Sequence, residues 1–327
     1  MLNRLLIIGC GRQGGRYLDV AVRLKIAQQL VTVDVWEGTG ARTAPGEHFT
    51  DLKRALEHSV YDAAIVATPT RTHAEVVAVL LAHSIPTLVE KPIAANLAEA
   101  ESLVDVMTSM GTPLFVGYVE RFNPVVQLLG ELLRSGVTGR AMSLVMKRYG
   151  VSPSDPPDAD VIHDLSVHDI DLVLHMIAKP RLLGAAGCVD RSTGQIHTAQ
   201  LLLRSKDVIV GVESSRMAMR RERTISILAE SAYLVADLIE QHVDIFRNPT
   251  HHFDDNELAA FGTISPHDLG IRLVPESREP LAEEMKAFVA SLADRPDPVL
   301  ATAHGALASS AIADAASAMI MAADAAG

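Results

Sequence analysis

The sequence has little cysteine and no long apolar run. Its two cysteines, Cys10 and Cys188, show no pairing pattern, so we expect two reduced thiols and no disulfide. No apolar stretch reaches the length of a membrane span, because polar residues such as Ser309 and Asp314 interrupt the Ala-rich C-terminal segment. The apolar run at residues 5–8 is too short for a secretory signal. These absences predict a cytoplasmic protein that does not enter a membrane.

Positive charge is also scarce, with 29 Lys and Arg residues against 40 Asp and Glu and a net charge of −11. An acidic chain without a basic stripe gains nothing from attraction to a phosphate backbone, so nucleic acid is not expected as a partner. A small anionic ligand remains possible, because a local arginine or a helix N-terminus can outweigh the overall field.

The length of 327 residues suits two domains. In the first third, helical patterns separate short apolar runs at residues 4–9, 30–35, 63–67, 87–89 and 114–116. Strands that alternate with helices predict a parallel sheet with right-handed crossovers. We therefore expect a Rossmann dinucleotide-binding domain at residues 1–118.

The rest of the chain has a different pattern. Longer strands are expected, in meander order, at residues 140–148, 199–203, 208–214, 224–229 and 233–238, after a helix at about 164–177. Residues 154–158 predict a Pro-rich loop, and helices at about 279–293 and 304–323 are expected to close the chain. The sequence thus predicts an α/β protein whose second domain, residues 119–327, is α+β and built on an open, mostly antiparallel sheet.

The first predicted strand runs into a G-x-G-x-x-G turn formed by Gly9, Gly11 and Gly14. The turn opens a helix, and Asp34 ends the next strand, which is the full context of a dinucleotide site. Asp34 is expected to bind the adenosine ribose and to repel a 2′-phosphate, so the predicted cofactor is NAD. Arg12 has two open interpretations, a contact with a phosphate and a solvated side chain.

Four further segments resemble the Gfo/Idh/MocA family of oxidoreductases. Residues 67–73 resemble its "ATP…H" turn, residues 89–93 its "EKP" signature, residues 117–124 its "GY…RFNP" segment, and residues 164–171 its "DxGxHxxD" helix start, with Ser166 in place of the usual glycine. The order and spacing agree over nearly the whole chain. Together with the glycine turn, the resemblance implies these cofactor-binding residues: Gly9, Gly11, Arg12, Gln13, Gly14, Asp34, Thr68, Pro69, His73, Glu90 and Lys91.

The "RFNP" motif and residues 215–241 also resemble the nucleotide-sugar branch of this family, which includes UDP-N-acetylglucosamine 3-dehydrogenases. This implies oxidation of a secondary hydroxyl of a nucleotide-linked sugar to a ketone. Two alternatives stay open: a free sugar or polyol dehydrogenase or ketosugar reductase, and an NAD-binding regulator without catalysis. A regulator should lack proton-transfer residues, and Lys91, Asp164 and His168 are all present.

Lys91 follows a strand at the carboxyl edge of the predicted sheet, where such folds bind ligands. Burial and a cationic nicotinamide would disfavour its charged form and make it a base, whereas Glu90 would act in the opposite direction. The Lys91–Pro92 peptide is a candidate cis bond. The expected catalytic residues are Lys91, His168 and Asp164.

Asp164, His168, Asp171 and His175 recur at helical spacing. The resemblance assigns substrate binding and proton transfer to Asp164 and His168, and Asp171 is expected to position them. His175 is expected to be a core histidine. No HExxH spacing exists, and hydride transfer to NAD requires no metal, so no metal site is predicted.

The remaining candidates for substrate binding are Tyr118, Arg121, Asn123 and Arg148. The first three are expected at the domain junction, and Arg148 is expected to contact an anionic substrate. For Arg121 the open alternative is an interdomain salt bridge, and a similar alternative stays open for Arg148. Exposed sheets in such second domains often pair, so a homodimer or homotetramer acting on a small sugar substrate is expected.

Overall fold

The computed structural model describes residues 1–35, 46–151, 159–177, 179–248, 258–267, 270–293 and 295–326. The chain forms two compact units, Met1–Val119 with Leu281–Ser310 and Glu120–Pro280 with Ala311–Gly327. The expected second domain ran without interruption to residue 327, whereas Leu281–Ser310 packs with the first unit. An amphipathic pattern marks a helix as packed but does not name the sheet that it covers. The predicted loop at residues 154–158 lies outside the described residues.

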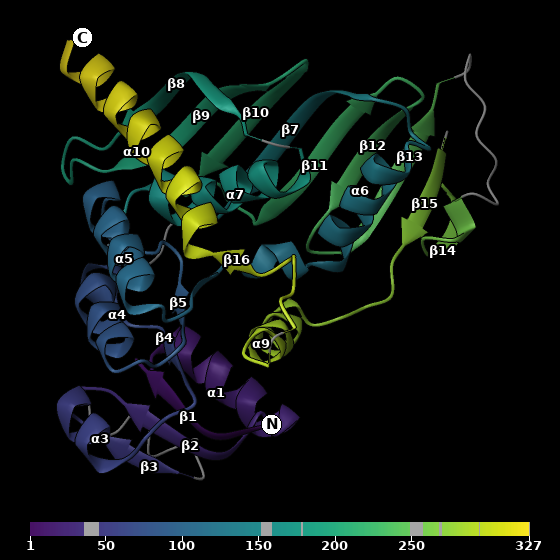
Figure 1. Cartoon of the computed structure of the whole chain (residues 1–327). Coiled ribbons are helices and arrows are strands. Elements are labelled where there is room, and N and C mark those ends of the chain that lie inside the picture. The colour runs from purple at the N-terminus through teal and green to yellow at the C-terminus, as the bar shows by residue number, and fades with distance from the viewer. Residues whose placement is uncertain are drawn as a thin grey trace. The chain divides into compact units, whose positions relative to one another are not determined.

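The first unit is built on a sheet in the order β16-β6-β5-β4-β1-β2-β3 (Figure 1). Neighbouring strands from β1 to β6 pair in parallel, and β16 pairs antiparallel with β6. The strands are β1 (Leu2–Ile8), β2 (Ala27–Val33), β3 (Glu47–Phe49), β4 (Ala63–Val66), β5 (Thr87–Glu90), β6 (Leu114–Gly117) and β16 (Ala301–Thr302). This parallel order confirms the predicted Rossmann fold.

Helices cover this sheet. They are α1 (Arg12–Leu24), α3 (Leu52–His58), the 3₁₀ turn η1 (Thr70–Thr72), α4 (His73–Ala82), α5 (Leu97–Met110) and α9 (Pro280–Ser291). Asn96 starts α5 because its side chain accepts a hydrogen bond from the Glu99 N–H. Helix α9 lies against α1, because Tyr17 of α1 is hydrogen-bonded to Glu284 of α9. It also lies against β6, where Phe288 of α9 packs edge to face on Phe115.

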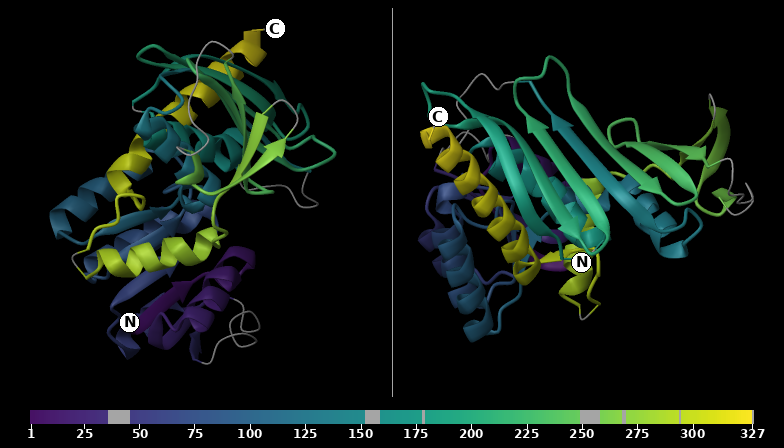
Figure 2. Two further views of the ribbon diagram at one scale, coloured as in Figure 1. Left: turned by 90° about the vertical axis from the view of Figure 1, so that its right-hand side faces the viewer. Right: turned by 90° about the horizontal axis from the view of Figure 1, so that it is seen from above.

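The second unit is built on a larger sheet in the order β14-β15-β13-β12-β11-β7-β10-β9-β8 (Figure 2). The strands are β7 (Ala141–Tyr149), β8 (Arg181–Val189), β9 (Ile196–Ser205), β10 (Val208–Ser215), β11 (Glu222–Ala229), β12 (Ala232–Asp237), β13 (His242–Arg247), β14 (Thr263–His267) and β15 (Gly270–Val274). All pairs are antiparallel except β7 with β10. The expected meander is therefore corrected at β7, which lies between β11 and β10.

One face of this sheet carries the core of the second unit. Its helical segments are α6 (Pro124–Ser135), a π-helical turn at Ile162–Ser166, α7 (Val167–Met176) and the end of α10 (Ala303–Ala326). Leu129 of α6 and Ile170 of α7 belong to the same buried cluster as Val212 and Ile227 of the sheet. The single helix predicted at 164–177 is thus a π turn that continues into α7.

Among the described residues, α10 is the one helix long and apolar enough to cross a membrane by length and composition, a test that core helices also pass. A third of its apolar window is buried, and Ala313 and Ile320 belong to the core of the second unit. Asp314 is hydrogen-bonded to His163. These contacts are those of a helix packed in a globular domain.

Candidate active site

The glycine turn between β1 and α1 has the shape that a dinucleotide pyrophosphate requires. A Cβ on Gly9, which has a φ of +86°, would lie 2.6 Å from the Ala67 carbonyl oxygen, and one on Gly14 would lie 1.7 Å from that of Gly9. A Cβ on Gly11 would meet nothing within 4 Å, and Gly11 caps α1 without a side chain. The first and third glycines therefore allow close packing, while the second leaves open space before the helix N–H groups, which attract anions.

Asp34 follows β2 and is tied to this turn. Its Oδ2 accepts a hydrogen bond of 2.7 Å from the Cys10 N–H, so the carboxylate lies beside the glycines. The Cys10 thiol is buried, and this burial, with Asp34 nearby, raises its pKa to about 11. Cys10 is therefore an unreactive thiol at neutral pH. Arg12 is exposed.

The loops after β4 and β5 meet at the same carboxyl edge of the sheet. His73 joins them, with Nδ1 2.8 Å from the Pro92 carbonyl and Nε2 2.9 Å from the Thr68 carbonyl. Burial lowers the pKa of His73, and the two facing carbonyl groups oppose that shift. The Lys91–Pro92 peptide is cis. The structure thus gathers the residues expected to bind the cofactor, including Thr68, Pro69, Glu90 and Lys91, at one edge of the first unit.

In the second unit, two buried ion pairs hold α7, the helix that carries His168. Arg148 of β7 donates to Asp169, with Nη2 2.7 Å from Oδ1, and Arg121 donates to both carboxylate oxygens of Asp171 at 2.6 and 2.7 Å. Burial raises the pKa of both Asp169 and Asp171, and the facing guanidinium groups oppose that rise. Such pairs fix the register and rotation of a helix more surely than they add stability.

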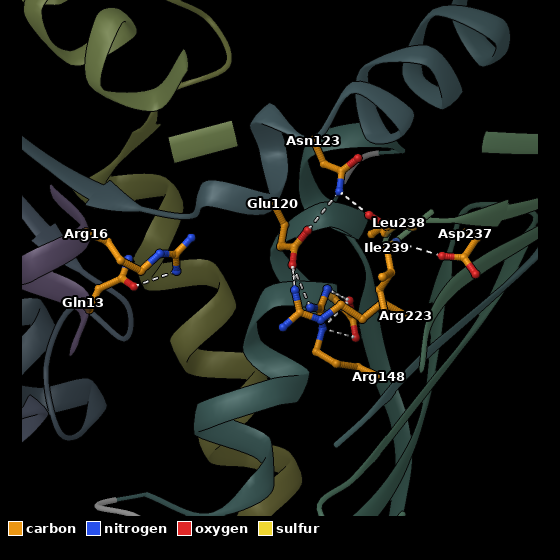
Figure 3. A network of polar contacts seen from close by, with 10 residues as sticks. Gln13, Arg16, Glu120, Asn123, Arg148, Arg223, Asp237, Leu238 and Ile239 are labelled. Atoms are coloured by element: carbon orange, nitrogen blue, oxygen red, sulfur yellow. Dashed lines mark hydrogen bonds and ion pairs between the residues drawn. The ribbon is translucent and has the colours of Figure 1, made fainter. Parts of the chain in front are cut away.

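Glu120 links Arg148 to a second arginine. Its Oε1 accepts from Arg148 Nη1 at 2.9 Å and from Arg223 Nη1 at 2.8 Å (Figure 3). Although burial alone would raise the pKa of Glu120, the two guanidinium groups hold it below its usual value. Asn123 donates to the Leu238 carbonyl at 3.0 Å, and its side-chain oxygen caps α6.

These contacts revise several expected substrate contacts. The Arg148 side chain is 3% exposed and its guanidinium contacts two carboxylates, so the geometry does not support a contact with an anionic substrate. Arg121 forms an ion pair with Asp171 inside the second unit, whereas the expected alternative was an interdomain salt bridge. Asn123 is buried, and its side chain caps the N-terminus of α6. Tyr118 is also buried, and its hydroxyl lies 3.0 Å from Ser309 Oγ within the first unit.

Asp164 and His168 remain partly exposed. Asp164 lies on the π turn, and Arg216 Nη2 donates to its Oδ2 at 3.2 Å while 42% of the side chain stays exposed. His168 stands near the start of α7 and is half-buried. Asp171 is fully buried, and its ion pair with Arg121 holds α7 in place. His175 is half-buried rather than fully in the core, and this burial lowers its pKa to about 4. No group of metal-binding side chains occurs among the described residues.

Sequence reasoning missed the partners of these residues. Glu120 lies within residues 117–124 and Arg223 within residues 215–241, yet only the sheet register brings Arg223 opposite Arg148. Tyr17 and Glu284 complete a buried polar group around Glu90. A glutamate on the apolar face of a predicted helix is a signal that could have marked Glu284.

A family model and several known proteins match parts of this chain. Residues 3–118 match the GFO_IDH_MocA model, described as an oxidoreductase family with an NAD-binding Rossmann fold. The chain is 29% identical over 226 residues to the myo-inositol dehydrogenase Hyg17 of Streptomyces leeuwenhoekii, covering 64% of this chain and 68% of that protein. It is 27% identical over 236 residues to the UDP-N-acetylglucosamine 3-dehydrogenase of Acidithiobacillus ferrooxidans, covering 71% and 70%.

Similarity in structure extends through both units. The solved structure of UDP-N-acetylglucosamine 3-dehydrogenase GnnA from Acidithiobacillus ferrooxidans matches with a TM-score of 0.80 and 21% identity, over 98% of this chain and 99% of that one. This likeness shows the shared fold, including the mostly antiparallel second sheet. The glycine turn and Asp34 fit the NAD that the family binds. The predicted resemblance is confirmed for the part of the chain that the family model matches: residues 3–118 match the Gfo/Idh/MocA oxidoreductase family, with its NAD-binding Rossmann fold.

Proposed function

We propose that this oxidoreductase is a cytoplasmic NAD-dependent dehydrogenase of nucleotide-linked sugars, with the 3-hydroxyl of UDP-N-acetylglucosamine as the leading substrate group. The observation that carries the proposal is which side chains of the π turn and α7 are buried and which stay exposed. Asp169 and Asp171 are locked into the core by two arginines, while Asp164 and His168 stay partly exposed for a ligand. The similarity to a UDP-N-acetylglucosamine 3-dehydrogenase in sequence and fold supports the substrate class.

The proposed chemistry divides between the two units. Bound NAD supplies the hydride acceptor. In the first unit, the glycine turn holds the pyrophosphate, Asp34 binds the ribose hydroxyls, and Lys91 lies at the same sheet edge. In the second unit, His168 and Asp164 bind the sugar. Lys91 and His168 are the two candidates to accept the hydroxyl proton as the C–H bond breaks, because lysine and histidine side chains can act as general bases.

A free polyol is the alternative substrate class. The similarity to the myo-inositol dehydrogenase Hyg17 favours it, at 29% identity. The two classes differ in the need to bind a nucleotide, so one assay separates them. A non-catalytic regulator is less well supported, since Lys91, Asp164 and His168 are all present.

We also propose that the second unit assembles the protein into a homodimer or homotetramer through the outer face of its sheet. Ile209, Leu228 and Tyr233 are 42–53% exposed, and the strand register sets them in one row across β10, β7, β11 and β12. Tyr233 stacks on Phe246 of β13, which extends the row. The test compares the mass in solution of Ile209→Lys with that of the unchanged protein. If the sheet face forms the interface, the variant should have the smaller mass.

The substrate test follows NADH production by the purified protein. UDP-N-acetylglucosamine, other UDP-sugars, myo-inositol and glucose are compared, and NADP replaces NAD in a parallel series. We expect turnover of UDP-N-acetylglucosamine with a preference for NAD. Oxidation of myo-inositol or glucose with no activity on any UDP-sugar would refute the nucleotide-sugar proposal and support the polyol alternative.

A further inference from the structure

Behind the Glu90–Lys91 turn, the first unit buries one phenol between two carboxyl groups. Tyr17 Oη lies 2.9 Å from Glu90 Oε1 and 2.9 Å from Glu284 Oε2. Tyr17 and Glu284 are each 0% exposed. The three residues come from α1, the end of β5 and α9, so the contact forms only when α9 returns to the first unit.

Counting protons in this contact leads to a definite charge state. A phenol has a single proton to donate, and an ionised carboxylate can only accept. Tyr17 can therefore donate to one of the two glutamates, and the other hydrogen bond exists only if that glutamate donates to the phenol oxygen. Two ionised carboxylates facing one buried phenol would leave a repulsive contact in a medium of low dielectric. One of the two glutamates must carry a proton.

The surrounding donors identify Glu90 as the ionised member. Its Oε1 also accepts from Gln13 Nε2 at 2.6 Å, and its Oε2 accepts from the Lys91 N–H at 3.2 Å. Arg16 donates to Gln13 Oε1 at 3.0 Å (Figure 3). The amide nitrogen of Gln13 is then the group that faces Glu90. Three donors stabilise a negative charge on Glu90. The proton therefore belongs on Glu284.

We propose that Glu90 and Glu284 share one proton through the Tyr17 hydroxyl, that this proton rests on Glu284, and that its position sets the charge of Glu90 beside Lys91. When the proton moves, the Glu284 Oε2–H bond breaks and a bond to Tyr17 Oη forms. The proton that Tyr17 held passes to Glu90 Oε1. Glu284 becomes the carboxylate, Glu90 becomes neutral, and the total charge is unchanged.

This transfer has a consequence for Lys91 that rests on the proposed function. An ionised Glu90 favours a positive charge on Lys91. A neutral Glu90 removes that influence, so Lys91 more readily takes the neutral form that can accept a proton. Tyr17 and Glu284 would thus act as positioning residues that tune the base without touching substrate. Two charged side chains lie near the hydrogen bonds that join Glu284, Tyr17 and Glu90. They are Arg16 of α1, which acts through Gln13, and Lys91 after β5.

Close packing around the Tyr17 hydroxyl keeps it in place between Glu284 and Glu90. Gly117 of β6 packs so closely that a Cβ there would lie 2.9 Å from Tyr17 Oη. Burial, with both glutamates facing the hydroxyl, raises the pKa of Tyr17 well above its usual value, so Tyr17 remains a donor. Burial also raises the pKa of Glu90, which keeps Glu90 able to take up the proton.

Infrared difference spectroscopy on the full chain tests where the proton rests. Glu284→Gln keeps a neutral hydrogen-bond donor at the same place, and Glu283→Gln is its control, one residue along α9 and ion-paired with Lys286 near the surface. At neutral pH we expect the carbonyl band of a protonated carboxylic acid in the unchanged protein and in Glu283→Gln, and its loss in Glu284→Gln. Loss of the band in Glu90→Gln instead would overturn the assignment to Glu284. Absence of the band from the unchanged protein would overturn the shared proton.

Thermal unfolding across pH gives an independent reading. A glutamate that is protonated in the folded state and ionised in the unfolded state makes stability fall as pH rises. The melting temperature of Glu284→Gln, relative to the unchanged protein, should therefore increase between about pH 5 and about pH 8.5, since an ordinary glutamate titrates near 4.3. The Glu283→Gln difference should stay flat. A constant difference for Glu284→Gln would contradict the proposal.

The link to Lys91 is read from the pH dependence of turnover on the substrate found in the assay above. Glu284→Gln should shift that profile and Glu283→Gln should not; an unchanged profile would overturn the link. The infrared and unfolding measurements need neither substrate nor NAD. They therefore remain decisive for the shared proton even if the proposed dehydrogenase activity fails.

Discussion

Arg148 and Asp169 form a buried ion pair that joins β7 to α7, with Nε 3.1 Å from each carboxylate oxygen and Nη2 2.7 Å from Oδ1. Asp169 follows His168 in the chain, so this pair fixes the turn of helix that carries the proposed base. The arginine is also shared with Glu120. Its loss would leave buried carboxylates without their main counter-charge.

We therefore expect Arg148→Met to lower the free energy of unfolding by about 3–5 kcal/mol, the range for removing one partner of a buried pair. Asp169→Asn should cost less, because Arg148 keeps Glu120 as a partner. Chemical denaturation measures both. The control is Arg140→Met, which breaks the exposed pair with Glu230 and should cost no more than about 1 kcal/mol. Equal costs for the buried and the exposed arginine would show that the network does not hold α7.

His163 predicts a dependence of stability on pH. Its Nδ1 lies 2.8 Å from Asp160 Oδ1, and its Nε2 lies 2.7 Å from Asp314 Oδ1 on α10. Although burial opposes the charge, these two carboxylates raise the pKa of His163 to about 9. Only the imidazolium can donate both bonds.

Because the folded pKa of His163 is raised, its stabilisation is complete below the unfolded value of about 6.5 and is lost as pH rises through about 9. We expect the melting temperature of the unchanged protein to fall over this interval, and the fall to be smaller in His163→Gln. Thermal unfolding at a series of pH values measures it. Profiles that run parallel would mean that His163 is neutral in the folded protein.

The glycine turn separates folding from cofactor binding. Gly11→Ala adds a methyl group into open space, so the fold should persist, while dinucleotide affinity falls because that space is where the pyrophosphate must approach. Gly14→Ala should destabilise the first unit, since its Cβ would lie 1.7 Å from the Gly9 carbonyl oxygen. Gly15→Ala, also in open space but one residue further along α1, is the control. Calorimetry with NAD and a melting curve on each variant test this, and unchanged affinity in Gly11→Ala would count against the site.

How far the sequence predicts this protein depends on the range of the contact concerned. The glycine turn, Asp34 and the strands of the first unit follow from local pattern, and the structure has them in the expected order. The parallel pairing of β7 with β10 and the return of Leu281–Ser310 to the first unit depend on contacts between distant segments. For the same reason, Arg148 was open to two interpretations until its buried partners were located.

The central claim is that Lys91 and His168 handle the proton of the substrate hydroxyl, and a pair of single variants tests it most directly. Lys91→Met should keep NAD affinity, because the glycine turn and Asp34 are untouched, and should lower turnover by about 10²–10⁴-fold, the usual cost of losing a general base. His168→Ala should lower turnover less. Calorimetry with NAD and the steady-state rate on the substrate found in the assay are measured for both. Intact NAD binding with lost turnover in Lys91→Met is the result that we predict, and near-normal turnover in that variant would contradict the claim.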